Sequence, residues 1–405
     1  MIIQTDYKLK NLVNFKKNLS VPIHRWFNIK EGYSNELVQN YISKNKISEG
    51  FIIDFFSGSG TTALTAKQNK LKYFGTEVNP FLFLLSKVKL YDYSLTDIKS
   101  LIYLRKNLLI KKKNIKQYDL KLSIAKKVFD LNYEKMKYVR DNILNIKETK
   151  YKDFFIVVLC GIIEKIGVAK KDGNGLKYPK NKKPEDFDVC FNNQFQLMIK
   201  DLQNNKFYNQ AGSEIINNDC RNLNQKIKEK IKNKTSLIIF SPPYANCFDY
   251  SEVYKLELWV SNQIKEYDNL KKIRNNSLSS HLNKILKTDT CMDIIDKEIS
   301  VLNTKKLWSK KIIFMLKNYF LEMENILRNC HEILNKNGKC VIVIGNSAYA
   351  GTVIKTDEIF STIAKKIGFK NIEINIARKL RSSSQQSKIL GEKNALRESI
   401  VILKK

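Results

Sequence analysis

The sequence predicts an α/β protein built on a doubly wound, largely parallel sheet. Apolar runs of strand length alternate with helical stretches through much of the chain. A glycine-rich turn follows the first buried run, and acidic residues stand at the ends of several predicted strands. The last two predicted strands are joined by a polar loop instead of a helix, so we expect them to form an antiparallel pair at the end of the sheet.

The composition sets limits on the class of protein. The chain has 405 residues, of which 43% are hydrophobic, so one large domain with insertions or two domains are expected. It has no uninterrupted apolar run of membrane-spanning length and no signal pattern at its N-terminus, which predicts a protein without a membrane partner. The seven cysteines are scattered without a C-x-x-C pair, which favours reduced thiols in the cytoplasm and no metal site.

The net charge points to a polyanionic partner. Lys and Arg total 72 against 40 Asp and Glu, giving a formal charge of +32. The abundance of Lys, Asn and Ile is also typical of an AT-rich genome, so part of the excess can be codon bias. Nucleic acid is the leading candidate for the partner, and an ordinary solvated surface is the alternative.

The first motif is a glycine loop. An apolar run at residues 51–56 leads into Ser57-Gly58-Ser59-Gly60-Thr61-Thr62, which is followed by a helix. A strand, a glycine loop and a helix in this order bring a cofactor against backbone N–H groups. No Lys follows the last glycine, so this is not a phosphate-binding loop of the Walker type, although a dinucleotide fingerprint would accept it.

A second predicted strand, residues 72–77, ends in an acid. Glu77 follows Asp54 at the distance along the chain where a carboxylate holds ribose hydroxyls in such folds. An ordinary acid at a strand end is the competing interpretation. Asp219 closes a third short strand in the same way.

The second motif is Ser241-Pro242-Pro243-Tyr244, which follows an apolar run at residues 237–240. Two consecutive prolines stiffen the turn and leave its carbonyls free of any strand ladder. The motif therefore places an aromatic ring beside a hydroxyl and a free carbonyl. Such a turn can grip a planar group by its face and accept hydrogen bonds from an amino group at its edge, although a rigid turn after a core strand is the plainer interpretation.

Two lysine-rich interruptions separate these motifs from the rest of the predicted sheet. Residues 95–210 are mainly helical in pattern, with a strongly apolar helix near 153–168 that must be buried. The basic loop at 170–183 is predicted to contact DNA phosphates through Lys180, Lys182 and Lys183. The second interruption, residues 261–310, carries Arg274, Ser277 and His281, which are candidates for reading base edges; solvated surface is the alternative for both loops.

Beyond residue 310 we expect a long helix near 311–334, a buried strand near 338–346, a helix at 359–367 and the closing strand pair. The polar loop between these strands, residues 378–397, is the remaining place for DNA recognition. The predicted organisation is as follows: 1–94, N-terminal segment and cofactor-binding half; 95–210, helical basic insertion; 211–260, catalytic half; 261–310, second insertion; 311–405, remainder of the sheet.

Together, the two motifs resemble those of the amino-methylating DNA methyltransferases, which modify exocyclic nitrogens with S-adenosylmethionine. The glycine motif of that family is similar to residues 54–61, and its (Asp/Asn/Ser)-Pro-Pro-(Tyr/Phe) motif is met by residues 241–244. Residues 24–34 are similar to the segment that precedes the first strand in the family. The implied fold is a Rossmann-like class I methyltransferase sheet with antiparallel terminal strands and mainly helical insertions.

The resemblance implies roles for individual residues. Ser241 and the Pro242 carbonyl would accept the two hydrogen bonds of an amino group, and Tyr244 would stack on a base flipped out of the duplex. The implied catalytic residues are Ser241, Pro242, Pro243 and Tyr244. The implied contacts to S-adenosylmethionine are Lys30, Asp54, Phe55, Ser57, Gly58, Gly60, Thr61, Glu77 and Asp219.

The resemblance leaves the target base open. Serine at the first position of the motif favours N4 of cytosine, whereas Asp or Asn is commoner among enzymes that methylate N6 of adenine. Methylation at C5 is disfavoured because no Cys follows any of the six prolines. The expected function is modification of double-stranded DNA within a restriction–modification system, with a cognate endonuclease as a candidate partner. The alternatives are an RNA amino-methyltransferase, a catalytically silent nucleic-acid-binding subunit and a nicotinamide dehydrogenase.

Overall fold

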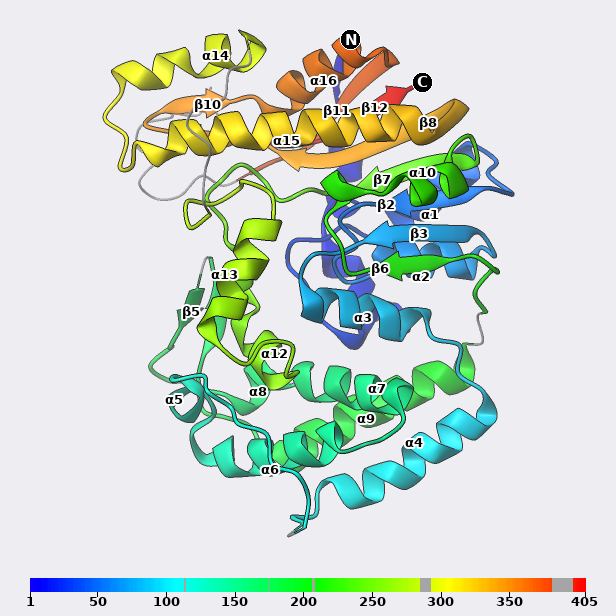
Figure 1. The fold of residues 1–405 in the computed structure, drawn as a ribbon, viewed down its shortest axis with the longest axis vertical. Helices are drawn as coiled ribbons and strands as arrows, with labels where there is room; N and C mark the ends of the chain where they lie inside the picture. The colour runs from blue at the N-terminus through cyan, green and yellow to red at the C-terminus, as the bar shows by residue number, and fades with distance from the viewer. Residues whose placement is uncertain (113, 174, 206–207, 285–292, 381–395) are drawn as a thin grey trace.

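The computed structural model describes residues 1–405 except 113, 174, 206–207, 285–292 and 381–395 (Figure 1). An eight-stranded mixed sheet forms its centre. β12 runs antiparallel to both of its neighbours, β8 and β11, and the other neighbouring pairs are parallel. In spatial order the strands are β1 (Ile2–Thr5), β11 (Lys370–Lys379), β12 (Arg397–Lys404), β8 (Leu334–Gly345), β7 (Thr235–Phe240), β2 (Phe51–Asp54), β3 (Lys72–Thr76) and β6 (Glu214–Ile216). The predicted fold class and its antiparallel terminal pair are confirmed.

The N-terminus differs from the polar arm that its sequence suggests. β1 pairs in parallel with β11, with Ile2 opposite Glu373. The edge of a sheet offers unpaired backbone N–H and C=O groups, and any short extended segment can satisfy them whatever its hydrophobic pattern. Side-chain periodicity therefore gave no signal for this strand.

Two groups of helices cover the two faces of the sheet. Along the buried strands successive side chains alternate between faces, so that Ile52 and Leu237 pack on one side and Ile53 and Ile238 on the other. The first face is covered by α1 (Asn35–Lys44) and α2 (Thr61–Gln68). The second is covered by α10 (Gln225–Ile231), α15 (Lys311–Ile333) and α16 (Thr356–Ile367).

The first insertion is a helical segment that lies below the sheet in Figure 1. Its main helices are α4 (Leu95–Leu108), α6 (Tyr133–Leu144), α7 (Thr149–Cys160) and α9 (Phe187–Asn204). The apolar side chains of α7 share one core with α3 (Pro80–Leu90) and with Trp26, which lies between β1 and β2 in the chain. Trp26 meets Phe154 of α7 edge to face at 5.9 Å. Within the predicted basic loop, β4 (Lys170–Asp172) and β5 (Gly175–Lys177) form a small hairpin.

Two short helices follow the Ser-Pro-Pro-Tyr turn, α11 (Tyr250–Val253) and α12 (Lys255–Val260). A buried arginine fixes α12 to the helical segment. Arg140 of α6 donates hydrogen bonds to the Val260 and Trp259 carbonyls at 2.9 and 3.3 Å, and a third to the carbonyl of Tyr118 at 3.0 Å. These acceptors compensate the desolvated guanidinium and tie the first insertion to the catalytic half.

The second insertion contributes α13 (Tyr267–Asn276) and α14 (Asp293–Ile299), which flank the undescribed residues 285–292. Most of the predicted recognition loop between β11 and β12 also lies outside the described residues. In the part of the chain that the structure describes, no helix combines the length and apolarity needed to cross a membrane.

Candidate active site

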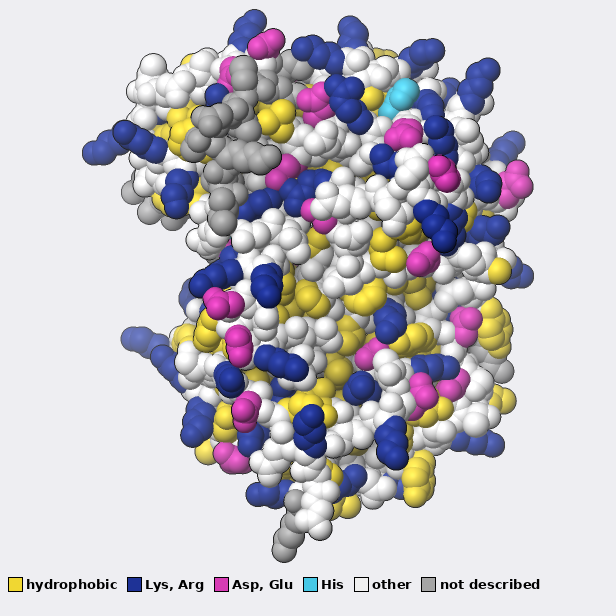
Figure 2. All heavy atoms as spheres, in the orientation of Figure 1, with side chains coloured by type: hydrophobic (Ala, Val, Ile, Leu, Met, Phe, Trp, Pro, Cys, Tyr) yellow, Lys and Arg dark blue, Asp and Glu magenta, His cyan; other side chains and the backbone are white. Residues whose placement is uncertain are grey.

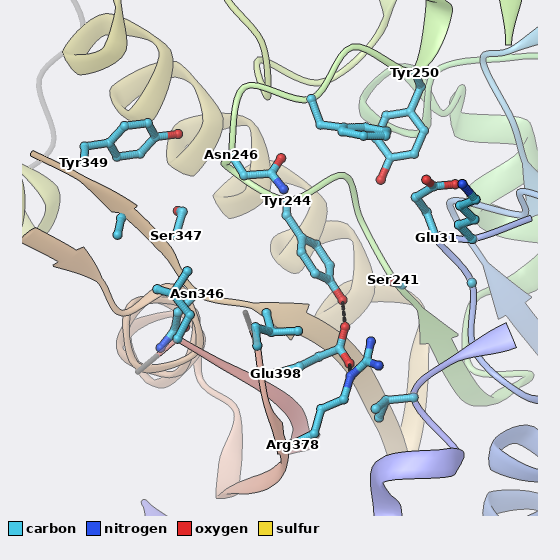
Figure 3. Close-up of a pocket in the computed structure, with 17 residues that line it drawn as sticks. Glu31, Ser241, Tyr244, Asn246, Tyr250, Asn346, Ser347, Tyr349, Arg378 and Glu398 are labelled. Atoms are coloured by element: carbon cyan, nitrogen blue, oxygen red, sulfur yellow. Dashed lines mark hydrogen bonds and ion pairs between the residues drawn. The ribbon is translucent and has the colours of Figure 1, made fainter. Parts of the chain in front are cut away.

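Two cavities meet at the carboxyl ends of β2, β3 and β7, toward which the parallel strands run in Figure 1. The first cavity lies between the glycine loop, the end of β3 and the chain that follows α13. The second cavity, of about 440 Å³, lies between the Ser-Pro-Pro-Tyr turn and the ends of β8, β11 and β12 (Figure 3). Glu31, Ser241 and Tyr250 line both cavities. A group held in one cavity can therefore meet a group held in the other beside Ser241.

The glycine loop has the backbone geometry that its sequence predicts. Gly58 and Gly60 have φ values of +50° and +77°, in the region that favours glycine. A Cβ at Gly60 would lie 3.1 Å from the Cα of Ser86 in α3, so this position also lacks space for a side chain. Gly58 lines the first cavity.

Asp54 lies beneath the glycine loop, outside the lining of either cavity. Its carboxylate accepts hydrogen bonds from the Phe56 N–H at 2.9 Å and the Tyr33 hydroxyl at 2.8 Å, and burial raises its pKa to about 6. Tyr33 also donates to the Ile239 carbonyl at 3.2 Å, which connects the loop to the strand before the Ser-Pro-Pro-Tyr turn. This geometry gives Asp54 the role of an anchor for the loop, not of a direct contact.

Of three other residues predicted to contact the cofactor, one lines the first cavity and two support the glycine loop. Phe55 lines the first cavity. Ser57 instead donates to the Thr76 carbonyl at 3.0 Å, which joins the loop to β3. Thr61 begins α2 beneath the loop, where its hydroxyl lies 3.4 Å from the side-chain nitrogen of Asn18.

Glu77 lines the first cavity at the end of β3. Its two oxygens accept hydrogen bonds from the N–H groups of Gly58 and Asn79, at 2.8 and 2.9 Å. Burial raises the pKa of this carboxyl to about 7 in spite of these bonds. Glu77 is the carboxylate in the cavity that is best placed to receive hydroxyl donors.

Asp219 also lines the first cavity, but its carboxylate is already engaged. Both oxygens accept from the Nε of Arg221, at 2.9 and 2.8 Å, and Arg221 also pairs with Glu322. A ligand amino group would share this carboxylate with Arg221. Lys30 lines the second cavity instead of the first, and its Nζ donates to the Lys171 carbonyl at 2.8 Å.

The Ser-Pro-Pro-Tyr turn forms the boundary between the cavities. Ser241 lines both, Pro243 lines the first and Tyr244 the second, while Pro242 is buried between them. The Tyr244 hydroxyl donates to Oε1 of Glu398 at 2.7 Å. Burial and that carboxylate raise the pKa of Tyr244 well above its ordinary value, so the hydroxyl stays protonated.

The six residues predicted to contact DNA have different environments. Lys180 and Lys183 are exposed, whereas the Nζ of Lys182 donates to the carbonyls of Glu164 and Gly167. Lys182 therefore braces the loop against the helical segment.

The guanidinium of Arg274 is held by Asp249 at 2.9 Å and by Glu252, which fixes α13 against the start of α11. Ser277 and His281 line the first cavity, and His281 is only 2% exposed. These positions argue against the base-reading role predicted for the three residues, because Arg274 is paired with two carboxylates and the other two residues lie at the first cavity.

His281 provides a test of whether the first cavity fits a polar ligand. Neither of its ring nitrogens has a hydrogen-bond partner among the described residues, and burial lowers its pKa, so the ring is neutral. An orphaned imidazole, a carboxylate at the end of β3 and loop backbone in one partly apolar cavity suit a ligand with hydroxyls, amino groups and a flat ring. The donor set is therefore compatible with S-adenosylmethionine.

Sequence reasoning did not single out several residues of the second cavity, among them Glu31, Asn246, Arg378 and Glu398. Glu31 accepts a hydrogen bond from the Tyr254 hydroxyl at 2.9 Å, and burial raises its pKa. Arg378 and Glu398 stand on β11 and β12, more than a hundred residues after the motif that they flank. No local pattern could have connected them with Ser241.

The sheet order, with antiparallel β12 inserted between β8 and β11, and the cavity at the glycine loop define a class I methyltransferase fold. Residues 13–87 match the DNA methylase family. The chain is 27% identical to the type II methyltransferase M.BsoBI of Geobacillus stearothermophilus, over all of this chain and 90% of the relative. It is also 27% identical to the type II methyltransferase M.AvaI of Anabaena variabilis, over 98% and 89% of the two chains.

These matches confirm the resemblance to the amino-methylating DNA methyltransferases, whose methyl donor is S-adenosylmethionine. Among solved structures, the rRNA methyltransferase aviRa of Streptomyces viridochromogenes aligns over 96% of this chain and 92% of its own. The TM-score of that alignment is 0.31 and the identity 7%. The fold assignment therefore rests on the sheet order itself.

Proposed function

We propose that this protein is a site-specific DNA methyltransferase that modifies an exocyclic amino group of a flipped-out base, with N4 of cytosine favoured. The observation that carries the proposal is the position of Ser241, in a Ser-Pro-Pro-Tyr turn at the junction of two cavities. One cavity suits the cofactor and the other a planar base. The enzyme would serve as the modification component of a restriction–modification system in the cytoplasm, beside a cognate endonuclease.

The first cavity would hold S-adenosylmethionine, which supplies an electrophilic methyl group when bound. Gly58 would present loop backbone, Glu77 would receive the ribose hydroxyls, and Asp219 would accept from the adenine amino group while remaining paired with Arg221. Asp54 would keep the loop in position through the Phe56 N–H and Tyr33. Orientation of the two reactants supplies most of the catalysis that this arrangement can offer.

The second cavity would receive the target base. Ser241 Oγ and the Pro242 carbonyl would each accept a hydrogen bond from one N–H group of its amino group. These two hydrogen bonds would turn the nitrogen lone pair out of conjugation with the ring. Tyr244 would stack on the exposed face of the base. Glu31, at the junction, is an additional acceptor whose raised pKa suits it to take up the proton that the nitrogen loses.

The DNA would approach from the side on which both cavities open. Figure 2 shows a hollow at the left edge of the molecule, the edge toward which the parallel strands run in Figure 1, with Lys and Arg side chains above and below it. Lys180 and Lys183 are the exposed lysines that we propose as phosphate contacts. Serine at the first motif position supports cytosine N4 by resemblance, and adenine N6 remains the second candidate.

The deciding experiment incubates the protein with tritiated S-adenosylmethionine and duplex DNA, and then digests the DNA to nucleosides. We expect label in N4-methyl-2′-deoxycytidine from the duplex, and a loss of about 10- to 100-fold in kcat for Ser241→Ala with cofactor affinity preserved. Label in N6-methyl-2′-deoxyadenosine would reassign the base. A parallel incubation contains RNA in place of the duplex. Label in RNA alone, or no label in duplex DNA of varied sequence, would overturn the proposed function.

A further inference from the structure

A buried carboxylate on β12 holds the aromatic residue of the catalytic turn. Glu398 is 3% exposed and lines the second cavity. Its Oε1 accepts the hydrogen bond from the Tyr244 hydroxyl at 2.7 Å, and its Oε2 pairs with Nε of Arg378 at 2.5 Å. Figure 3 shows the three side chains as one chain of contacts along a wall of the cavity.

The strand register explains why these groups meet. Glu398 lies opposite Gly345 of β8 on one side and opposite Arg378 of β11 on the other. Three adjacent strands therefore present a glycine, a carboxylate and a guanidinium in one row. The ring of Tyr244 lies across this row, because a Cβ at Gly345 would be 2.6 Å from its Cε2 and 2.8 Å from its Cδ2.

The row restrains both ends of the tyrosine side chain. Gly345 gives the ring a flat surface of bare backbone, and Glu398 fixes the direction of the hydroxyl. Arg378 compensates the buried charge of Glu398, which would otherwise be costly to desolvate. Since the same ring lines the second cavity, its plane is set before any ligand enters.

We propose that Glu398, held by Arg378, is a positioning residue that fixes the ring of Tyr244 as the stacking platform for the target base. This inference rests on the proposed function and adds a role for the antiparallel strand of the sheet. Glu398 acts through the tyrosine and not on the base. Its effect should therefore vanish once the tyrosine hydroxyl has been removed.

A double-mutant cycle on Tyr244→Phe and Glu398→Ala tests this dependence. The measurements are kcat and KM for duplex DNA, the fluorescence of 2-aminopurine at the target position and the affinity for S-adenosylmethionine. Each single variant should reduce capture of the flipped base by about tenfold, and the double variant should be no worse than Glu398→Ala. Cofactor affinity should be unchanged, and Glu398→Gln should recover much of the loss because its amide oxygen can still accept from Tyr244.

Tyr244→Phe keeps the ion pair between Arg378 and Glu398, so it remains informative if Glu398→Ala fails to fold. Ser399→Ala is the matched control, because Ser399 is the next buried side chain on β12 but donates to Asp357 at 2.7 Å. This control should unfold at a lower temperature and retain normal base capture.

Additive losses in base capture would overturn the inference by showing that Glu398 acts independently of the tyrosine hydroxyl. Normal capture in Tyr244→Phe would overturn it by showing that the ring needs no hydrogen bond to Glu398. Thermal unfolding of the wild type, the two single variants and the double variant measures the contact between Tyr244 and Glu398 without any substrate. An additive result there would show that the contact does not form. A wild-type protein that methylates no DNA, yet shows coupled unfolding, would instead refute the proposed function and with it the role in stacking.

Discussion

Glu77 illustrates at the scale of a single residue how a binding site is prepared at the expense of stability. Its carboxyl is buried at the floor of the first cavity, and its two hydrogen bonds to backbone N–H groups do not offset the desolvation that raises its pKa to about 7. The unfolded chain has the ordinary glutamate pKa near 4.5. The folded protein therefore binds this proton more tightly than the unfolded chain does, and the difference must appear in the pH dependence of folding.

We predict that the contribution of Glu77 to stability is complete below about pH 4.5 and is lost as the pH rises through about 7. Glu77→Gln removes this titration. The free energy of unfolding of the wild type, relative to that of the variant, should therefore fall between pH 5 and pH 8. Denaturant titrations of both proteins across that range measure the difference, and a constant difference would contradict the raised pKa.

His281 is the second residue whose environment makes a prediction. We expect His281→Ala to weaken S-adenosylmethionine binding by about tenfold, because the orphaned ring nitrogens lie in the wall of the first cavity. Binding to duplex DNA without cofactor should change little, in contrast to the role predicted from sequence. Calorimetry on this variant and on His331→Ala, a histidine that packs on Phe369 and lines neither cavity, would separate the two roles.

At the scale of elements, the hairpin formed by β4 and β5 and the loop after it combine two kinds of lysine. Lys182 is tied to carbonyls of the helical segment, whereas Lys180 and Lys183 extend into solvent. We predict that Lys180→Ala with Lys183→Ala weakens binding to all duplexes alike. The slope of log affinity against log salt should fall by about two units, roughly one for each phosphate contact.

The matched variant is Lys182→Ala, which should leave the salt slope unchanged and lower the unfolding temperature. A slope that is intact in the double variant would show that the phosphate contacts lie elsewhere, for example in the loop between β11 and β12. Arg274, like Lys182, is expected to support the fold, since its contacts to Asp249 and Glu252 join α13 to α11.

At the scale of the whole molecule, the helical segment and the catalytic half share one hydrophobic core. Phe154 of α7, Leu85 of α3 and Trp259 of α12 belong to the same buried cluster, although they come from three separate parts of the chain. The insertions are therefore not expected to unfold on their own.

We predict a single cooperative transition in calorimetry, and a lower transition temperature for the entire protein in Phe154→Ala. The removal of a fully buried ring costs about 3–5 kcal/mol and leaves a cavity. Leu131→Ala is the control because Leu131 is 86% exposed. Two well-separated transitions, with only one shifted by Phe154→Ala, would show that the helical segment folds independently.

The sequence by itself determined the α/β class, the glycine loop, the acid at the end of β3 and the Ser-Pro-Pro-Tyr turn. Each is a local pattern, in which apolar periodicity, glycine freedom or proline stiffness acts over a few neighbouring residues. Glu77 and Gly58, which the same local patterns singled out, both line the first cavity. These patterns gave no account of β1, whose pairing depends on a sheet edge made by distant residues.

The tertiary structure decided which polar residues face the site and which support it. Asp54 lies beneath the glycine loop, where it accepts hydrogen bonds from Tyr33 and the Phe56 N–H. His281 follows α13 and lies in the wall of the first cavity. Glu398 reaches Tyr244 because β12 pairs with β8 in a register that no local pattern encodes. Side-chain direction and charge pairing depend on the register and packing of distant segments, and these exist only once the sheet has formed.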